Sequence, residues 1–171
     1  MTANTIIKLD EAAIRQLIPH RHPFLFITDA EIQSADSATG SALWPAGHPI
    51  LSGHFPGLPI VPGVCQAEAA AQLAAVAASH AQRSEGLGPK EEMVGVLASI
   101  RKVLYHSPLF PDQTLRLSIK LKHAFGMMAI CTGNGFHDDT KILSFELGLG
   151  IVPRNEVEQR IAESRKSGEI A

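Results

Sequence analysis

The chain has 171 residues, which is enough for one ordinary domain with a sizeable buried core. Hydrophobic residues make up 45% of it and charged residues 19%, so the composition excludes a disordered chain and indicates a globular one. The formal net charge of −2 argues against a nucleic-acid-binding protein, because such proteins usually carry a basic excess.

The cysteines and the apolar segments indicate the cellular compartment of the protein. Cys65 and Cys131 lie far apart without a C-x-x-C motif, which predicts neither a disulfide scaffold nor a zinc-thiolate site and fits a reducing compartment. No basic region leads into an apolar stretch at the amino terminus, so no secretory signal is expected. The most apolar segment, residues 64–79, contains three polar side chains and is too polar to span a membrane. We therefore expect a cytoplasmic protein that binds neither membranes nor nucleic acid.

The first part of the chain predicts a short helix followed by two strands. Residues 10–18 begin with a capping residue, Asp10, have apolar residues at helical spacing, and end at a proline. The aromatic and β-branched run 24–32 predicts a strand, the polar cluster 33–40 a turn, and residues 41–44 a second strand.

A loop rich in proline and glycine separates these strands from a long helix. Residues 45–63 contain five prolines and four glycines, which exclude a regular helix and suit a central strand poorly. We expect a rigid, shaped loop of the kind on which sites are often built. The alanine-rich residues 64–79 predict a long helix. Because its side chains are small on nearly every face, this helix is expected to lie buried close against a sheet.

The second half predicts an antiparallel sheet. After an exposed loop at 80–92, four segments have strand-like patterns: 93–105, 115–123, 127–136 and 142–151. Residues 133–135 and 137–140 suit a hairpin turn between the last two. Residues 154–171 predict a solvated, frayed helix or a disordered end. The fold class is therefore α+β, with one domain over residues 1–153, a sheet wrapped on a central helix, and a charged carboxy-terminal tail.

The loop and the start of the long helix carry the candidate catalytic residues. His54 stands in the loop sequence G-H-F-P-G, and Glu68 lies in the second turn of the helix with Gln72 at i+4 on the same face. A carboxylate among alanines is costly to bury unless its pKa shifts or a partner satisfies it. A histidine and a carboxyl group of raised pKa can take one proton and give another near neutral pH. Free backbone N–H groups at Gly63 and Val64 could stabilise an oxyanion.

Two motifs in register give the chain a family resemblance. The string GHFPGLPIVPGVCQAEAAAQ, from Gly53 to Gln72, strongly resembles the FabZ-type 3-hydroxyacyl-[acyl-carrier-protein] dehydratases. The stretch IPHRHPFLF, from Ile18 to Phe26, resembles the start of the same family at a matching distance. The resemblance covers roughly residues 10–150. It implies a hotdog fold, in which an antiparallel sheet wraps a central helix, and assembly as a dimer or a trimer of dimers.

The resemblance also implies roles for individual residues. The catalytic histidine falls on His54, its acidic partner on Glu68, the oxyanion donor on the Gly63 N–H at the helix start beside Val64, and a supporting glutamine on Gln72. The His and the Glu of one site would come from different subunits. The implied reaction is dehydration of a 3-hydroxyacyl thioester, delivered by an acyl carrier protein, to a trans-2-enoyl thioester. No metal or redox cofactor is expected.

The chain departs from the family pattern at three places. Residues 104–108, LYHSP, replace an aromatic-and-basic run before a proline. The following Pro111-Asp112 lacks a glycine, and residues 47–49, GHP, replace Asn-Glu-Pro. Because a missing basic pair would alter contact with an acidic carrier surface, these departures indicate a specialised paralogue, for example in polyene or other secondary acyl synthesis.

Other interpretations of the same residues remain open. A hotdog thioesterase would use Glu68 or His54 to activate water, and a non-catalytic hotdog subunit would bind a carrier protein or pair with an active partner. Cys65 near a helix start could act as a nucleophile, although a small buried hydrophobe is favoured. A metal site is also conceivable, but the spacing matches no compact ligand motif; the histidines concerned are His20, His22, His48 and His54. The family's isomerising relatives have Asp at the acid position, so Glu68 favours simple dehydration.

Overall fold

The computed structural model describes residues 6–84, 93–123 and 128–167. Within them, seven antiparallel strands form one sheet in the order β1-β2-β3-β5-β6-β7-β4. The strands are β1 (Ile7–Asp10), β2 (Ile27–Ser34), β3 (Ser37–Ala42), β4 (Met93–Tyr105), β5 (Leu115–His123), β6 (Met128–His137) and β7 (Thr140–Pro153). The helices are α1 (Glu11–Leu17), α2 (Gly63–Ser84), α3 (Arg154–Ser167) and the short 3-10 helix η1 (Pro49–Leu51).

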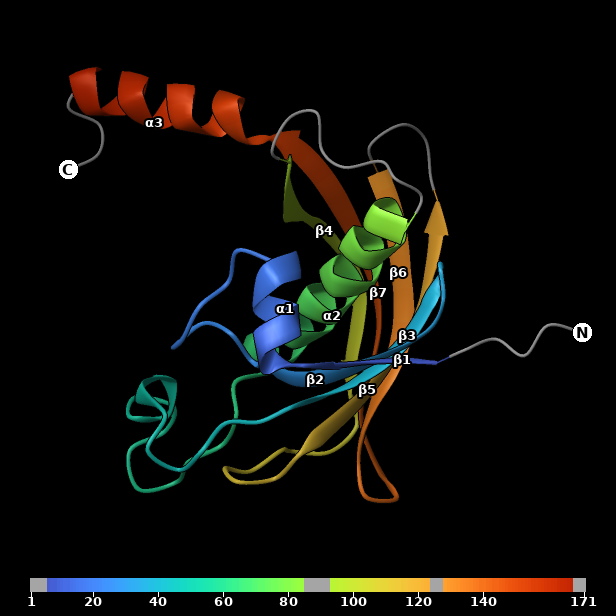
Figure 1. Ribbon diagram of the computed structural model, residues 1–171. Helices are drawn as coiled ribbons and strands as arrows, with labels where there is room; N and C mark the ends of the chain where they lie inside the picture. Colours follow the sequence, from blue (N-terminus) through green and yellow to red (C-terminus); the bar gives the residue numbers. More distant parts are fainter. Residues whose placement is uncertain (1–5, 85–92, 124–127, 168–171) are drawn as a thin grey trace, which may run out of the picture.

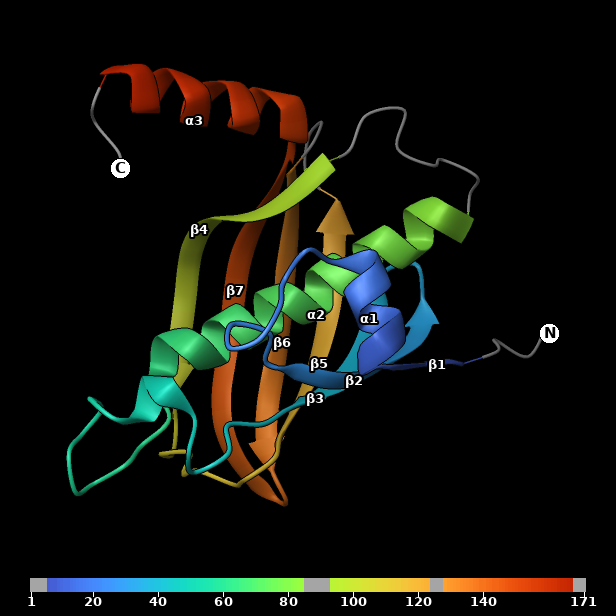
Figure 2. The same cartoon turned by 60° about the vertical axis from the view of Figure 1, so that its left-hand side comes forward.

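The long helix α2 runs across the inner face of the curved sheet, with α1 beside it (Figures 1 and 2). Its buried alanines allow the backbones to approach closely; they include Ala69, Ala70, Ala74 and Ala77. The approach is tight at Gly40 of β3, where a Cβ would lie 2.9 Å from the Leu73 side chain and 2.6 Å from the Asp29 carbonyl oxygen. The α+β class and the buried central helix predicted from the sequence are confirmed.

Helix α1 begins and ends as its sequence predicts. Asp10 caps it by accepting a hydrogen bond from the Ala13 N–H at 2.8 Å, and its last residue, Leu17, precedes Ile18-Pro19. Ile14 is fully buried in the core. Because α1 packs beside α2, the segment that follows it is placed against the face of α2 that carries the candidate carboxylate.

The amino-terminal strands differ from the sequence prediction in two ways. The polar residues 33–40 were expected to form a turn, but only Ala35 and Asp36 do, and Ser37–Ala42 is strand β3. In β3 the inward residues are small and the outward ones polar, so the period-two pattern looks like a turn in the sequence. Strand β1 was not predicted, because its four residues are largely exposed and show no clear alternation.

The carboxy-terminal strands largely match the prediction, with one correction. Strands β4 and β5 have the expected bounds, and β6 and β7 shift by one or two residues. Residues 133–135 lie inside β6 rather than in a turn, whereas the turn predicted at 137–140 is present at Asp138 and Asp139. Glycine is required at Gly133 for space, since a Cβ there would lie 2.6 Å from the Phe145 ring.

The loop and the tail also contain short helices. Residues 45–62 form a shaped loop as expected, interrupted by the three residues of η1, and Gly63 already belongs to α2. Residues 154–167 form α3, which extends away from the end of the sheet (Figures 1 and 2). Among the described residues, no helix is both long enough and apolar enough to cross a membrane.

Strand β4 forms one edge of the sheet and exposes an apolar surface. Its outer edge has no partner strand within the described chain. Five of its large apolar or aromatic side chains are between 36% and 55% exposed: Val96, Leu97, Ile100, Leu104 and Tyr105. Long apolar edge strands are templates for pairing with another chain.

Candidate active site

The loop around His54 fixes which ring nitrogen carries the proton and leaves the other nitrogen free to act as a base. Its backbone N–H donates to the Leu51 carbonyl at 3.1 Å, and its ring Nδ1 lies 2.9 Å from the Ile60 carbonyl oxygen. Because a carbonyl oxygen only accepts, Nδ1 must carry the proton in this contact. Nε2 then has a free lone pair, with no hydrogen-bond partner in the described part of the chain. The half-buried imidazole is thus oriented to remove a proton through Nε2.

The start of α2 offers two backbone donors. The N–H groups of Cys65 and Gln66 donate to the Pro62 carbonyl, at 3.0 and 3.3 Å. The N–H groups of Gly63 and Val64 have no acceptor among the described residues, as expected for the first positions of a helix. These two donors, at the positive end of the helix dipole, can receive negative charge that develops on a substrate oxygen.

The ring of Tyr105 packs directly over Gly63. A Cβ at Gly63 would lie 2.6 Å from the tyrosine Cζ and 2.9 Å from its hydroxyl oxygen. Glycine therefore allows the aromatic ring to lie beside the helix start. Burial raises the pKa of the Tyr105 phenol, and the neighbouring Cys65 raises it further. The phenol thus remains a hydrogen-bond donor at neutral pH.

Glu68 is fixed by Gln72 one turn later, as the i+4 spacing predicts. The Gln72 Nε2 donates to Glu68 Oε1 at 3.0 Å and to the Phe24 carbonyl at 2.8 Å. The Gln72 Oε1 accepts from the Phe26 N–H at 3.0 Å. Gln72 is only 1% exposed, and these three bonds use both its donors and its acceptor. Glu68 itself keeps 19% of its side chain exposed, so a substrate can reach it.

His54 and Glu68 do not meet within one chain. No hydrogen bond or ion pair joins them in the part of the chain that the structure describes. Gly63 and Glu68 are five residues apart on α2, which places them about 140° apart around the helix axis. We name His54 and the Gly63 and Val64 N–H groups the base half of the candidate site, and Glu68 with Gln72 its acid half. Gly63 and Glu68 therefore lie on different sides of α2.

The acid half opens into a cavity of about 310 Å³. Glu68, Gln72 and His20 contribute the polar groups near one another, and small or apolar side chains form most of the remaining wall. These include Ala71, Ala75, Ala78, Leu97, Met128 and Ile151. A polar group joined to an apolar cavity suits a ligand with a reactive polar end and a hydrocarbon chain.

Sequence reasoning missed the position of His20 beside Glu68. The His20 Nε2 lies 3.4 Å from Glu68 Oε1, and both residues line the same cavity. The four neighbouring histidines do not converge, because His22 contacts Glu11, and His48 contacts the Pro23 carbonyl. Among the described residues, no three His, Cys, Asp or Glu side chains gather as metal ligands. The sequence feature that could have indicated a role for His20 is its position in the IPHRHPFLF motif.

Cys65 has the properties of a buried hydrophobe rather than a nucleophile, as favoured from the sequence. Its side chain is 4% exposed. Burial, and secondarily the nearby Glu68 carboxylate, raises the pKa of the Cys65 thiol. Since the thiolate is the nucleophilic form, both effects suppress its reactivity at neutral pH.

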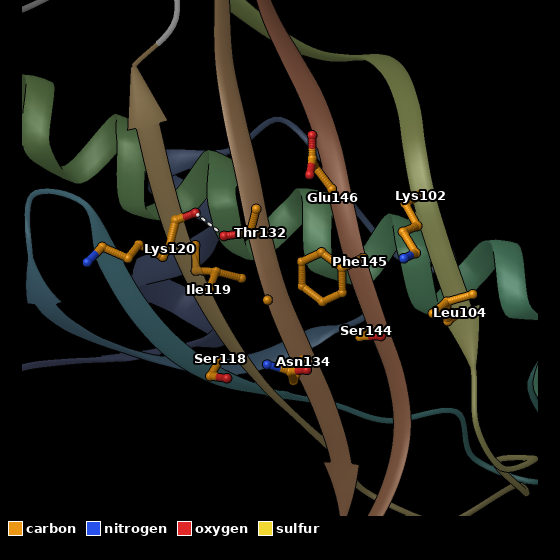
Figure 3. A pocket seen from close by; sticks show the side chains of 11 residues that line it. Lys102, Leu104, Ser118, Ile119, Lys120, Thr132, Asn134, Ser144, Phe145 and Glu146 are labelled. Atoms are coloured by element: carbon orange, nitrogen blue, oxygen red, sulfur yellow. Dashed lines mark hydrogen bonds between the residues drawn. The ribbon is translucent and has the colours of Figure 1, made fainter.

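A second hollow, of about 420 Å³, lies on the face of the sheet turned away from α2 (Figure 3). Phe145, Ile119 and Gly133 form its floor, and polar and charged side chains from β4 to β7 surround it. None of the candidate catalytic residues lines it.

Comparisons with known proteins agree with this geometry. Residues 30–135 match the family model of the ApeI-like proteins, described as ApeI dehydratase. The 3-hydroxyacyl-[acyl-carrier-protein] dehydratase FabZ of Roseiflexus sp. (strain RS-1) is 37% identical over 127 residues, covering 71% of this chain and 85% of the relative. The dehydratase heterocomplex ApeI:P from Xenorhabdus doucetiae aligns with a TM-score of 0.70 at 18% identity, covering 86% of this chain and 96% of that chain.

The fold and the sequence matches define a hotdog protein of the dehydratase type. Similarity of fold alone would not distinguish reactions, since the fluoroacetyl-CoA thioesterase FlK (T42A mutant) also aligns, with a TM-score of 0.56 at 14% identity over 75% of this chain and 96% of that one. The sequence matches are specific: the chain belongs to the ApeI-like dehydratase family, together with the FabZ dehydratases.

Proposed function

We propose that this protein dehydrates 3-hydroxyacyl thioesters carried on an acyl carrier protein and yields trans-2-enoyl thioesters. The observation that carries the proposal is that one chain holds His54 with a free ring nitrogen and Glu68 as a carboxyl group that opens into an apolar cavity. A dehydratase needs both groups, because one proton leaves C2 and another must reach the C3 hydroxyl.

The proposed reaction follows from the atoms that are free in each half. His54 Nε2 takes the proton from C2, and the Gly63 and Val64 N–H groups receive the charge that develops on the thioester oxygen. Glu68 donates a proton to the C3 hydroxyl, the C3–O bond breaks, the C2–C3 double bond forms and water leaves. The proposed reaction needs no redox cofactor, because no electrons are transferred to or from the substrate. It includes no metal, because His54 and Glu68 account for both proton transfers.

The proposed active unit is a dimer in which each site takes its base half from one subunit and its acid half from the other. The separation of the two halves around α2 supports this arrangement, and the exposed apolar edge of β4 offers the surface for pairing. A second copy of this chain would give a homodimer, which could assemble further into a trimer of dimers. A related hotdog subunit would give a heterodimer, and the ApeI:P heterocomplex is a solved precedent for such a partner.

Two buried, unpaired thiols, Cys65 and Cys131, support a reducing compartment such as the cytoplasm as the place of the reaction. The apolar wall of the cavity supports an acyl group as the ligand. The departures from the family at residues 104–108 lie at the end of β4, and we propose that they adapt the enzyme to a particular carrier or secondary acyl substrate.

Mass spectrometry of a panel of 3-hydroxyacyl carrier proteins tests the proposal. We expect the wild-type protein to remove one water from at least one substrate, and His54→Ala and Glu68→Gln to abolish the loss. His22→Ala and Glu146→Gln are matched controls, because these residues make exposed contacts with Glu11 and Arg101 outside the proposed site. Release of free acid would indicate a thioesterase, and a stable carrier complex without turnover would indicate a non-catalytic subunit.

A further inference from the structure

His20 is placed to control the geometry of Glu68, and this role rests on the proposed dehydration. The two residues are 48 positions apart in the sequence, but their side chains meet at 3.4 Å between Nε2 and Oε1. Both are mostly buried, with 23% of the His20 side chain and 19% of the Glu68 side chain exposed. Both line the same cavity as Gln72, so His20 belongs to the acid half.

The surroundings of the His20 ring determine which nitrogen carries its proton. Its Nδ1 is buried and has no hydrogen-bond partner among the described residues. A buried N–H without an acceptor is rarer and more costly than an acceptor nitrogen left without a donor. The proton therefore belongs on Nε2, which faces Glu68 Oε1. This tautomer is opposite to that of His54, whose proton lies on Nδ1.

This tautomer makes the two oxygens of Glu68 unequal. Oε1 accepts a hydrogen bond from the Gln72 Nε2, and the His20 Nε2 lies 3.4 Å from the same oxygen, a longer polar contact. Oε2 has no partner in the described part of the chain. When the carboxyl group is neutral, its proton must therefore lie on Oε2, and this oxygen is left to face the substrate.

We propose that His20 is a positioning residue that, together with Gln72, holds Glu68 Oε1 so that Oε2 presents the acidic proton to the C3 hydroxyl. Gln72 fixes the carboxylate from the same helix, whereas His20 fixes it from the segment after α1. Contacts to Oε1 from two different directions restrict rotation of the carboxyl plane, which a single contact would allow. His20 touches neither the substrate nor His54 in this account.

Kinetics of three variants test the proposal. We expect His20→Ala to lower kcat by about 10- to 100-fold with little change in KM, because a misplaced catalytic group slows the chemical step. His20→Gln should recover most of the activity, since its amide nitrogen can donate from nearly the same place as Nε2. His22→Ala is the matched control, because His22 also contacts a carboxylate, Glu11, but is 61% exposed and outside the cavity.

A measurement independent of turnover uses 15N NMR of the wild-type protein. We expect the His20 ring to carry its proton on Nε2, and a ring protonated on Nδ1 alone would overturn the proposal. An active wild type with unchanged kcat in His20→Ala, or a His20→Gln variant as impaired as His20→Ala, would refute the positioning role while the dehydratase function stands. A wild type that dehydrates no substrate would refute the function and with it the role of His20.

Discussion

Replacing Gln72 with methionine tests whether the hydrogen bonds of this side chain stabilise the fold and hold Glu68 in place. Methionine keeps nearly the length and volume of glutamine, so little cavity is created. It removes all three hydrogen bonds of Gln72, those with the Phe26 N–H, the Phe24 carbonyl and Glu68 Oε1. The perturbation is therefore mainly polar.

The magnitude follows from the groups that lose their partners. The Phe26 N–H lies in a residue that is 1% exposed, and a buried donor without a partner costs about 1–3 kcal/mol. The Phe24 carbonyl is partly exposed and can accept a hydrogen bond from water instead, so the loss of its hydrogen bond from Gln72 adds about 1 kcal/mol. We expect Gln72→Met to lower the free energy of unfolding by about 2–4 kcal/mol.

Urea unfolding at a fixed protein concentration measures this loss. The control is Gln159→Met on the exposed helix α3, where only an i,i+4 bond to Glu163 is lost and about 0.5 kcal/mol or less is expected. A loss below about 1 kcal/mol for Gln72→Met would refute the reasoning, because the unpaired Phe26 N–H alone should cost that much. Dehydration should also slow in this variant, since Glu68 loses its hydrogen bond from Gln72.

Three further predictions concern the helix start and the sheet edge. Tyr105 is the one tyrosine of the chain, so the absorbance of the protein reports its titration. We expect a pKa above 10.0 for Tyr105, and Cys65→Ala should remove part of this increase. A pKa at or below 10.0 would contradict the packing of Tyr105 over Gly63. Burial raises the pKa of Cys65, and it raises that of Cys131 to about 12, so both thiols should resist alkylation at pH 8 in the folded protein and react in urea. Rapid modification of the native protein would show that they are not buried. Ile100→Lys on the edge of β4 should shift the sedimentation of the protein toward the monomer and abolish dehydration, while the circular dichroism of the fold persists. A variant that remains an active dimer would exclude this edge as the interface.

The sequence was sufficient for the parts of the fold that depend on local patterns. The alanine-rich composition predicted α2, and the i+4 spacing of Glu68 and Gln72 predicted their contact because a helix fixes which residues are neighbours. Strand β5 alternates buried and exposed residues along its length, so its bounds could be predicted from the sequence. In β3 the same alternation is carried by alanine, glycine and small polar residues, which resemble a turn.

The remaining features depend on contacts between residues distant in sequence. Gln72 binds the backbone of Phe24 and Phe26 across 48 and 46 positions, and no local pattern indicates that a buried glutamine will find these partners. His20 was singled out as one of several histidines, but its neighbour Glu68 became visible only when α1 was placed beside α2. The packing of Tyr105 over Gly63 likewise depends on how the end of β4 lies against the helix.

The most direct test of the central claim is complementation between two inactive variants. His54→Ala lacks the base half and Glu68→Gln lacks the acid half, so each protein alone should fail to dehydrate the 3-hydroxyacyl carrier protein. If the halves of one site come from two subunits, unfolding, mixing and refolding equal amounts should give about a quarter of the wild-type activity, because half of the dimers then contain one intact site of two. Persistent inactivity of a mixture that is shown to contain the mixed dimer would contradict a site shared between His54 and Glu68 of different subunits.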